Sequence, residues 1–311
     1  MNYKAYEALH AFIEGGSVAQ AALRLHRTQP QVSRLLAQLE EEAGFVILRR
    51  EGRRLKLTDD GRRYYHHVYG LLRAQDALSD FTQDIRQGIT GRIRILAANH
   101  IIDGLALQAM AQCRLEDPTF SASLTARMPA DLQWWLGQQQ FDIALVQLPL
   151  EHPAIRTELL VRSEIVAVVG ASHHLRHRSH ISAEDVARES FITLGRRSVL
   201  GQRYEAGFET ANVQPAAPLE VSFSTSAVQL AAYGCGIALA EPFSALAQRH
   251  TGVVLRRFTP TVPLHYGLVF PKDVERSPAT EHFVRHLRAC AQSQSDALRV
   301  ALDRTTPGTD G

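Results

Sequence analysis

The most regular alternation of apolar and polar positions lies in the segment 28–43, TQPQVSRLLAQLEEEA. Its apolar side chains recur three or four residues apart, which predicts one buried face of a helix. They are Val32, Leu35, Leu36, Leu39 and Ala43. Thr28 is a suitable N-cap, Gln31 stands three residues later as in a capping box, and Pro30 is tolerated in the first helical turn. The segment therefore predicts an amphipathic helix with a polar outer face.

A second, shorter helix is predicted just before it. Residues 3–14 carry apolar side chains at helical spacing and end at a Gly-Gly pair, after which Ser17 can cap a helix that contains the Ala21-Ala22 pair. Small alanine side chains allow a neighbouring helix to approach closely. The link from this helix to Thr28 is very short. Two short capped helices joined in this way are typical of a helix-turn-helix, whose second helix lies in the major groove of DNA.

Alternating apolar and charged positions after these helices predict a β-hairpin. Leu55 and Leu57 alternate with charged residues, and the turn is expected at Glu51-Gly52. Arginine is in local excess here, although the net charge of the chain is only +2. Cations on such a wing can hold phosphates or reach the minor groove. The alternatives are an ordinary amphipathic helix at 28–43 and a solvated charged hairpin, but the two features side by side favour DNA binding.

The side chains expected to contact DNA belong to the outer face and N-terminus of the second helix, to the cap before the first, and to the wing. They offer amides, hydroxyls and cations that can hydrogen-bond base edges or phosphates. They are Ser17, Thr28, Gln29, Pro30, Gln31, Ser33, Arg34, Gln38, Arg50, Arg53, Arg54 and Lys56. The expected partner is double-stranded DNA.

A long helix is predicted from 59 to about 87. Asp59 and Asp60 lie in its first turn, where acidic side chains suit the helix dipole. Its apolar seam repeats every seven residues, at Tyr64, Leu71, Leu78 and Ile85. A narrow seam of this kind favours pairing with a second copy of the chain. The alternative is that the helix docks onto its own domain.

From residue 92 onwards, short apolar strands alternate with helices. Strands are expected at 92–98, 121–127, 141–147, 164–170, 190–194, 219–223, 235–240 and 264–270, and helices at 104–116, 129–139, 202–212, 224–233 and 278–292. This alternation implies parallel sheets with crossover helices. The segment 293–311 is polar and poor in aromatic residues, which predicts a partly disordered tail.

Composition narrows the function class. The three cysteines stand far apart, so neither a zinc motif nor a disulfide framework is expected. The N-terminus lacks the apolar run of a signal peptide, and no stretch reaches the roughly 18 apolar residues of a membrane span. Nucleophile-elbow and HExxH motifs are absent, which argues against an enzyme. We expect a cytoplasmic protein that needs no cofactor, has no membrane partner and is neither an enzyme nor an exported solute-binding protein.

The chain resembles the LysR-type transcriptional regulators as far as about residue 292. The matching segments are TQPQVSRLLAQLEEEAG (28–44), LRR (48–50), LKLTDDG (55–61), FDIALV (141–146) and GCGIALAEP (234–242). Leu48 departs from the family, which usually has phenylalanine there. The wing and GVVLRRFTPTVP (252–263) are similar to the branch that includes the lysine-biosynthesis activator and the opine-responsive regulators. This similarity favours an amino acid or a derivative as the effector.

The resemblance implies an α/β protein with an N-terminal winged helix-turn-helix and an effector domain like type 2 periplasmic binding proteins. The implied parts are the DNA-binding domain at 1–58, a linker and dimerisation helix at 59–91, effector subdomain one at 92–163 and 267–292, subdomain two at 164–266, and a flexible tail at 293–311. Family members usually act as tetramers that bend promoter DNA, and for this chain we expect a dimer or a tetramer. Their effector changes the contact with RNA polymerase. We expect the same partners for this chain.

The effector is expected beyond the carboxyl ends of strands, where ligands bind in open α/β sheets. Free N–H groups at a helix start suit a carboxylate, and Arg196 can add a charge-assisted hydrogen bond. The candidate residues are Asn99, His100, Ile101, Gln147, Leu148, Gly195, Arg196, Ser198, Ser224, Thr225 and Ser226. The alternatives are plain N-capping by the serines and threonine, a solvated loop at Arg196, and a regulator that needs no effector.

Four histidines between 173 and 180 invite the interpretation of a metal site. They are His173, His174, His177 and His180. Neither a cysteine nor a carboxylate joins them at ligand spacing in the sequence. No metal site is therefore expected.

Overall fold

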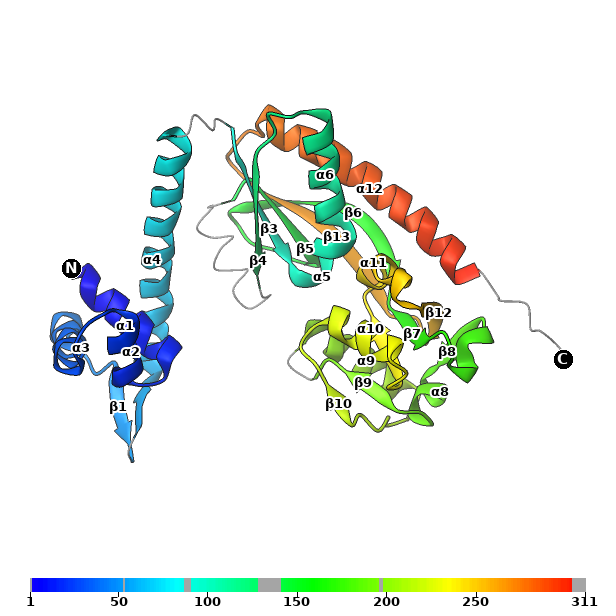
Figure 1. Cartoon of the computed structure of the whole chain (residues 1–311), viewed down its shortest axis with the longest axis horizontal. Helices are drawn as coiled ribbons and strands as arrows, with labels where there is room; N and C mark the ends of the chain where they lie inside the picture. Colours follow the sequence, from blue (N-terminus) through cyan, green and yellow to red (C-terminus); the bar gives the residue numbers. More distant parts are fainter. Residues whose placement is uncertain (1, 53, 87–90, 128–140, 196–197, 304–311) are drawn as a thin grey trace. The chain divides into compact units, whose positions relative to one another are not determined.

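The computed structural model describes residues 2–52, 54–86, 91–127, 141–195 and 198–303. The chain forms two compact units, Met1–Thr90 and Gly91–Gly311 (Figure 1). Each unit is built around buried apolar clusters of its own. No helix among the described residues is long and apolar enough to cross a membrane.

The first unit is a winged helix-turn-helix followed by a long helix, as predicted. Its elements are α1 (Tyr3–Gly15), α2 (Val18–Arg24), α3 (Gln29–Ala43), β1 (Leu48–Glu51), β2 (Arg54–Leu57) and α4 (Asp59–Arg86). The strands pair antiparallel, with Leu48 opposite Leu57. Gly52 has a φ of 61°, which favours glycine in the turn. The predicted wing is therefore confirmed.

Local hydrogen bonds explain where α2 and α3 begin and end. The Ser17 hydroxyl accepts a hydrogen bond from the Gln20 N–H at 3.2 Å. The Gln31 side chain accepts one from the Thr28 N–H at 3.0 Å, as expected for a capping box. Gly44 ends α3 with a φ of 75°. The sequence signals that predicted these boundaries are thus present as contacts.

Side-chain contacts also fix the wing relative to α3 and α4. The Glu40 carboxylate accepts hydrogen bonds from the backbone N–H groups of Ile47 and Leu48, each at 2.8 Å. The Thr58 N–H donates to the Ile47 carbonyl at 2.9 Å, and the Thr58 hydroxyl accepts from the Gly61 N–H at 2.9 Å. A side chain on Gly61 would place its Cβ 2.1 Å from the Ile47 carbonyl oxygen. The first turn of α4 therefore packs against the backbone before the wing at a distance that only glycine allows.

The second unit contains two mixed sheets (Figure 1). The first has the strand order β4-β3-β5-β13-β6, with β3 (Ile93–Ala98), β4 (Ala122–Arg127), β5 (Ile143–Leu148), β6 (Ile155–Glu164) and β13 (Pro263–Pro271). The second has the order β10-β9-β11-β7-β12-β8, with β7 (Val166–Gly170), β8 (His180–Ser182), β9 (Phe191–Thr193), β10 (Leu219–Glu220), β11 (Ile237–Ala240) and β12 (Val253–Thr259). The two sheets are the centres of subdomains one and two.

The expectation of parallel sheets was right only in part, because both sheets combine parallel pairs, such as β9 with β10 and β11, with antiparallel ones. β3 pairs parallel with β4 and β5, but β13 pairs antiparallel with both β5 and β6. In the second sheet, β7 pairs antiparallel with β11 and β12. Parallel neighbours need a crossover connection, usually a helix. The chain instead passes directly from β6 to β7 and from β12 to β13, so these strands cannot follow the crossover pattern.

The two passages between the subdomains lie side by side. The Ile165 N–H donates to the Val262 carbonyl at 2.9 Å. The single strand predicted at 164–170 is in fact the end of β6 followed by β7, and most of β6 was not predicted. Because β13 begins at Pro263, the return to subdomain one comes earlier than the predicted residue 267.

The helices of the second unit cover these sheets. They are α5 (Asn99–Ile101), the π-helical turn η1 (Ile102–Ala106), α6 (Leu107–Glu116), η2 (His174–His177), α8 (Ala183–Ala187), α9 (Val199–Thr210), α10 (Ser224–Ala232), α11 (Pro242–Ala247), η3 (Arg249–Thr251) and α12 (Pro278–Asp303). The helix predicted at 129–139 lies outside the described residues.

The disordered tail predicted from residue 293 was wrong as far as Asp303. Helix α12 continues through this segment, and Leu298 and Leu302 are buried. They extend the apolar face that includes Leu287 and Ala291, while the polar residues between them occupy the outer face. The polar composition therefore described one side of a helix. Residues 304–311 lie outside the described residues.

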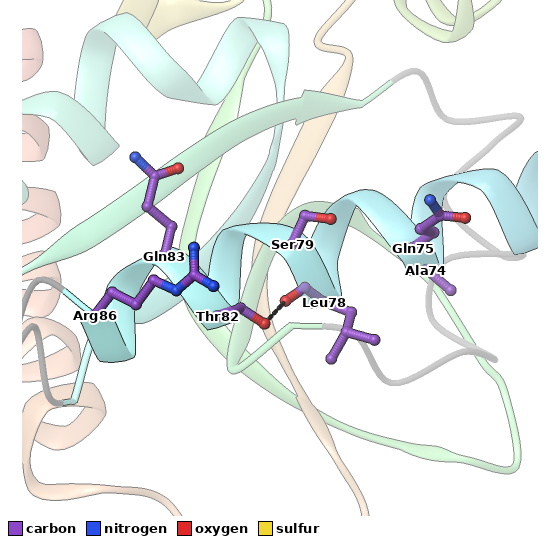
Figure 2. A pocket seen from close by; sticks show the side chains of 7 residues that line it. All are labelled: Ala74, Gln75, Leu78, Ser79, Thr82, Gln83 and Arg86. Carbon is purple, nitrogen blue, oxygen red and sulfur yellow. Dashed lines mark hydrogen bonds between the residues drawn. The ribbon is translucent and has the colours of Figure 1, made fainter.

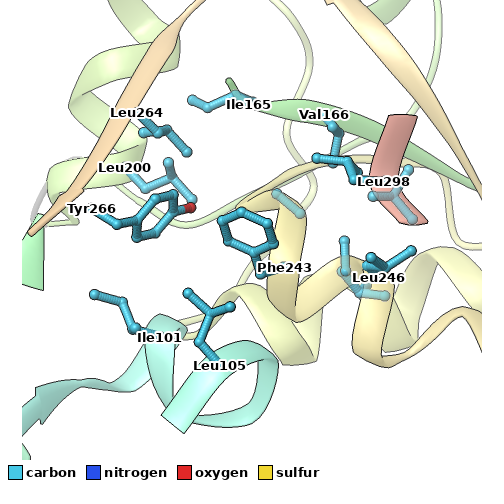
Figure 3. Close-up of a cluster of buried hydrophobic side chains, with 14 of the residues drawn as sticks. Ile101, Leu105, Ile165, Val166, Leu200, Phe243, Leu246, Leu264, Tyr266 and Leu298 are labelled. Atoms are coloured by element: carbon cyan, nitrogen blue, oxygen red, sulfur yellow. The ribbon is translucent and has the colours of Figure 1, made fainter. Parts of the chain in front are cut away.

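Apolar packing continues across the junction of the two subdomains (Figure 3). Tyr266 of β13 and Ile101 of α5 come from subdomain one, and Phe243 of α11 comes from subdomain two. The rings of Phe243 and Tyr266 lie 5.1 Å apart between centroids. Leu298, from the far half of α12, joins the same cluster. The two subdomains therefore share buried apolar surface at this place.

Candidate nucleic-acid interface and effector site

The outer face of α3 is exposed and polar. Val32, Leu36 and Leu39 are buried in the first unit. The predicted contact residues at the start and on the outer face of α3 are all exposed: Thr28, Gln29, Pro30, Gln31, Ser33, Arg34 and Gln38. Ser17, the N-cap of α2, is half-buried. The structure thus presents these residues at the surface, and their contact with DNA stays a prediction.

The exposed side chains of α3 differ in how free they are to bind DNA. The Gln31 carbonyl is engaged in the helix cap. Gln38 accepts a hydrogen bond from the Asn2 amide at 3.2 Å and donates to Glu42 at 3.4 Å. Arg34 forms no ion pair or hydrogen bond with any residue that the structure describes. Among the described contacts, Arg34 therefore has none to break if it binds DNA, and its contact with a base edge remains a prediction.

The wing is organised around one carboxylate. Glu51 lies 2.7 Å from Arg49 and 2.7 Å from Lys56. Hydrogen bonds and attraction from Lys56, and then from Arg49, lower the pKa of Glu51. Lys56, a predicted DNA contact, is therefore partly neutralised by Glu51, whereas Arg50 points to the other face of its strand, opposite Leu55. Arg53 and the side chain of Arg54 lie outside the described residues.

Replacing Arg34 with alanine is expected to weaken binding to a specific operator at least about tenfold, or about 1.4 kcal/mol. The reason is that an arginine on a recognition helix can form two hydrogen bonds with a guanine of the operator, and these bonds are not formed in non-specific complexes. Fluorescence anisotropy on operator and scrambled duplexes measures the ratio of the two affinities. Arg63→Ala, an exposed arginine of α4, is the control. An equal loss on both duplexes would instead indicate a phosphate contact.

The long helix α4 has two different halves. Val68 and Leu72 are buried against the first unit, with 2% and 6% of their surface exposed. Leu71, Leu78 and Ile85 remain 46%, 63% and 62% exposed. Figure 2 shows Leu78 among polar side chains on the far half of the helix. Val68 and Leu72 therefore dock onto the first unit, as the alternative expected, whereas the heptad positions Leu71, Leu78 and Ile85 are not covered by it.

A cation lies at the junction of the two effector subdomains. Arg203 of α9 donates hydrogen bonds to the carbonyls of Leu148, at 3.2 Å, and Pro263, at 3.0 Å. The His100 ring lies 6.4 Å from the Tyr266 ring. Burial, together with the charge of Arg203, lowers the pKa of His100 to about 4, so this imidazole is neutral near pH 7. Two predicted residues, His100 and Leu148, thus gather around an arginine that the sequence did not single out.

The junction also contains a buried carboxylate that the sequence analysis missed. Glu241 accepts hydrogen bonds from the N–H groups of Phe243, at 3.2 Å, and Ser244, at 2.9 Å, and from the Tyr266 hydroxyl, at 2.6 Å. Its own N–H donates to the Ser224 hydroxyl at 3.2 Å. Burial raises the pKa of Glu241, and burial beside Glu241 raises that of Tyr266. Tyr266 belongs to subdomain one, so this network fastens the two subdomains together.

The remaining effector candidates do not face a single site. Ser224 is buried and bonded to Glu241, whereas Thr225 and Ser226 line an open groove of about 720 Å³ with residues that include Asp103 and His250. The other candidates lie in different surroundings. Ile101 is buried in the apolar cluster, and Asn99 and Gln147 are half-buried. The Ser198 side chain caps the start of α9, and Gly195 has a φ of 71°. Arg196 lies outside the described residues.

A carboxylate does join the histidine cluster, contrary to the sequence analysis. The rings of His173 and His174 stack with centroids 4.7 Å apart, and Glu189 lies 3.2 Å from His174. The helix α8 brings Glu189 back to the histidines. Nδ1 of His173 already accepts a hydrogen bond from the Leu175 N–H at 3.2 Å. This contact satisfies one of the ring nitrogens inside the protein.

Two family models match the chain. The model "Bacterial regulatory helix-turn-helix protein, lysR family" matches residues 3–62, and the model "LysR substrate binding domain" matches residues 86–292. The chain is also similar to full-length solved structures. It superposes on CbnR, a LysR family transcriptional regulator, with a TM-score of 0.69 at 22% identity, covering 94% of this chain and 99% of that chain. The same protein in complex with its target DNA gives a TM-score of 0.66.

Curated relatives also match this chain over most of its length and of their own. The chain is 28% identical to the transcriptional activator protein LysR of Escherichia coli over 98% of both chains. It is 26% identical to the regulatory protein NocR of Agrobacterium fabrum, over 86% of this chain and 89% of that protein. It is 24% identical to the octopine catabolism/uptake operon regulatory protein OccR of Rhizobium meliloti, over 90% of this chain and 92% of that protein. The chain belongs to the LysR family and is a DNA-binding transcriptional regulator with a substrate-binding domain.

Proposed function

We propose that this regulator responds to a small carboxylate, an amino acid or a derivative of one, bound at the junction of its two effector subdomains. The observation that carries the proposal is Arg203, a partly buried guanidinium held by backbone carbonyls of the opposite subdomain. A carboxylate that takes over those hydrogen bonds gains a charge-assisted pair. The exchange alters the contacts between the subdomains, which is the kind of change an effector needs to produce.

The relatives support this class of effector. OccR is named for octopine catabolism and uptake, and octopine is an amino-acid derivative. The neutral His100 and the half-buried Asn99 add uncharged hydrogen-bonding groups. Such a set of groups suits a ligand that carries a carboxylate and further polar atoms.

For the DNA-binding half, we propose that α3 lies in the major groove and that the wing contacts the backbone. The exposed positions Leu71, Leu78 and Ile85 on α4 form the seam with a second copy of the chain, because an exposed heptad seam gains apolar burial by pairing. Dimeric or tetrameric binding to promoter DNA, followed by contact with RNA polymerase, completes the proposed mechanism.

DNase footprinting on the DNA upstream of this protein's own gene tests the proposal, with and without octopine and the proteinogenic amino acids. Protection whose extent changes with one of these compounds supports both DNA binding and the effector class. Protection that none of them changes would contradict the effector class. No protection at low salt would contradict DNA binding at that promoter.

Replacing Arg203 with alanine is expected to weaken binding of the effective compound at least about tenfold, because the charge-assisted pair with the carboxylate is lost. It is also expected to shift operator binding without effector towards the effector-bound pattern, because the hydrogen bonds to Leu148 and Pro263 are lost as well. Isothermal titration and footprinting measure the two affinities, and Arg188→Ala, an exposed arginine of the same subdomain, is the control. If Thr225→Ala removes the response and Arg203→Ala keeps it, the effector binds in the groove beside α10 instead.

A further inference from the structure

Two helices of subdomain one bring metal-ligating side chains together at a place that the proposed effector site does not include. Helices α6 and α12 pack against each other (Figure 1). Cys113 lies on α6, and His282 and His286 lie one turn apart on α12. One ligand atom from each of these three residues lies within 4.8 Å of the other two. Glu116, one turn after Cys113, places a carboxylate oxygen 2.5 Å from Nε2 of His286 and 4.0 Å from Nε2 of His282.

The two imidazole nitrogens that face this cluster have unmet hydrogen-bonding needs. Nε2 of His282 and Nε2 of His286 are buried and have no hydrogen-bond partner among the described residues. The close approach of Glu116 to His286 does not have hydrogen-bond geometry. Buried polar atoms are nearly always satisfied, and an ion is one way to satisfy them. Two such atoms facing one thiol and one carboxylate point to a ligand between them.

We infer that Cys113, His282 and His286, completed by Glu116, form a binding site for a divalent transition-metal ion, with Zn²⁺ as the best match. A tetrahedral set of one thiolate, two imidazoles and one carboxylate has the donor types that Zn²⁺ prefers. Zn–S and Zn–N bonds of about 2.3 and 2.0 Å place ligand atoms roughly 3.3–3.8 Å apart. The ligand atoms of Cys113, His282 and His286 must therefore approach one another by at most about 1 Å, whereas the Glu116 carboxylate must move away from Nε2 of His286.

Metal binding requires changes in the protonation and the side-chain positions of the residues around the cluster. Cys113 is fully buried, and this burial raises the pKa of its thiol to about 11, so the ion must displace a proton. The Glu116 side chain is 56% exposed, which gives the ion a route from solvent. Arg285 now lies 3.0 Å from Nδ1 of His282. Ligation through Nε2 leaves the ring proton on Nδ1, so the Arg285 guanidinium must move away.

The second histidine cluster of this chain is the weaker candidate. His173, His174 and Glu189 can also approach one ion. However, Nδ1 of His173 is already used by the Leu175 N–H, and the site has no thiolate. It provides a matched control within the same unit.

The test is a titration of the full-length, chelator-treated chain with Co²⁺, followed by displacement with Zn²⁺. Co²⁺ reports tetrahedral geometry by its visible absorption and a thiolate ligand by near-ultraviolet charge transfer. We expect one Co²⁺ per chain with both signals. His286→Gln should weaken binding at least about 100-fold, beyond the 10- to 100-fold typical of groups that only support ligands. Cys113→Ala should remove the charge-transfer band, and Arg285→Gln should tighten binding.

Controls separate the site from its alternatives. His174→Gln and Cys235→Ala should leave both signals unchanged, and circular dichroism checks that each variant is folded. Because Cys113 is in the core, Glu116→Gln serves as a second ligand variant at an exposed position. The inference is overturned if wild-type protein gives no tetrahedral spectrum. It is equally overturned if His286→Gln binds Co²⁺ as wild type does, or if His174→Gln alone abolishes binding.

Discussion

Replacing Glu241 with leucine is expected to lower the free energy of unfolding of the second unit by about 3–5 kcal/mol. The substitution leaves three buried donors without their acceptor, and each costs about 1–3 kcal/mol. They are the N–H groups of Phe243 and Ser244 and the hydroxyl of Tyr266. Urea denaturation followed by tryptophan fluorescence measures the loss, because both tryptophans of the chain are at positions 134 and 135 of this unit.

Glu241→Gln is the matched control and also tests the charge. Burial raises the pKa of Glu241 in the folded state above its ordinary value of 4.5. The carboxyl therefore contributes stability that is fully present below pH 4.5 and is lost as the pH rises through the folded pKa. The stability of wild type relative to Glu241→Gln should fall as the pH rises from 4 towards neutral. A difference that does not change with pH would show that Glu241 has an ordinary pKa.

Replacing Gly61 with alanine is expected to destabilise the first unit by about 3 kcal/mol, at the upper end of the range for overpacking. The added Cβ would lie 2.1 Å from the Ile47 carbonyl oxygen and 3.0 Å from the Thr58 hydroxyl. Backbone atoms cannot rotate away as a side chain can, so the start of α4 must move away from the wing. Thermal unfolding and operator affinity measure the two consequences.

Whether Gly61→Ala raises or lowers the free energy of unfolding distinguishes the clash from the effect of helix propensity. Gly61 lies inside α4, where alanine alone should stabilise the helix by about 0.5–1 kcal/mol. Ser79→Ala, at an exposed position of the same helix, is the control and should show only this propensity gain. A Gly61→Ala variant that is more stable than wild type would contradict the close approach.

The first unit was predictable because its signals are local. Ser17 and Thr28 cap their helices through hydrogen bonds with residues only three positions later in the sequence. The buried face of α3 consists of Val32, Leu36 and Leu39, which recur at helical spacing. A helix that turns its apolar side to one core repeats every three or four residues. The same logic located most strands of the second unit, because a buried strand is a short apolar run.

Long-range pairing was not predictable in this way. The sequence of β13 is apolar whether its neighbours run parallel or antiparallel, and only the direct passage at 260–262 makes them antiparallel. Most of β6 was missed because only one side of it is covered, so charged and apolar residues are mixed along it. The helical segment 293–303 was missed because its polar residues outnumber its few buried ones, among them Leu298 and Leu302.

The candidate sites divide in the same manner. Sequence alone determined the winged helix-turn-helix, the exposed face of α3 and the exposed heptad positions of α4, because each depends on spacing within one element. The two-part α/β effector domain was implied by the resemblance to the LysR family and did not follow from that spacing. Only the tertiary structure decided that Arg203 reaches Leu148, that Glu241 meets Tyr266, and that Cys113 lies beside two histidines of α12. Those contacts join residues far apart in the chain, and the burial that makes them chemically significant exists only after both partners have packed into the same core.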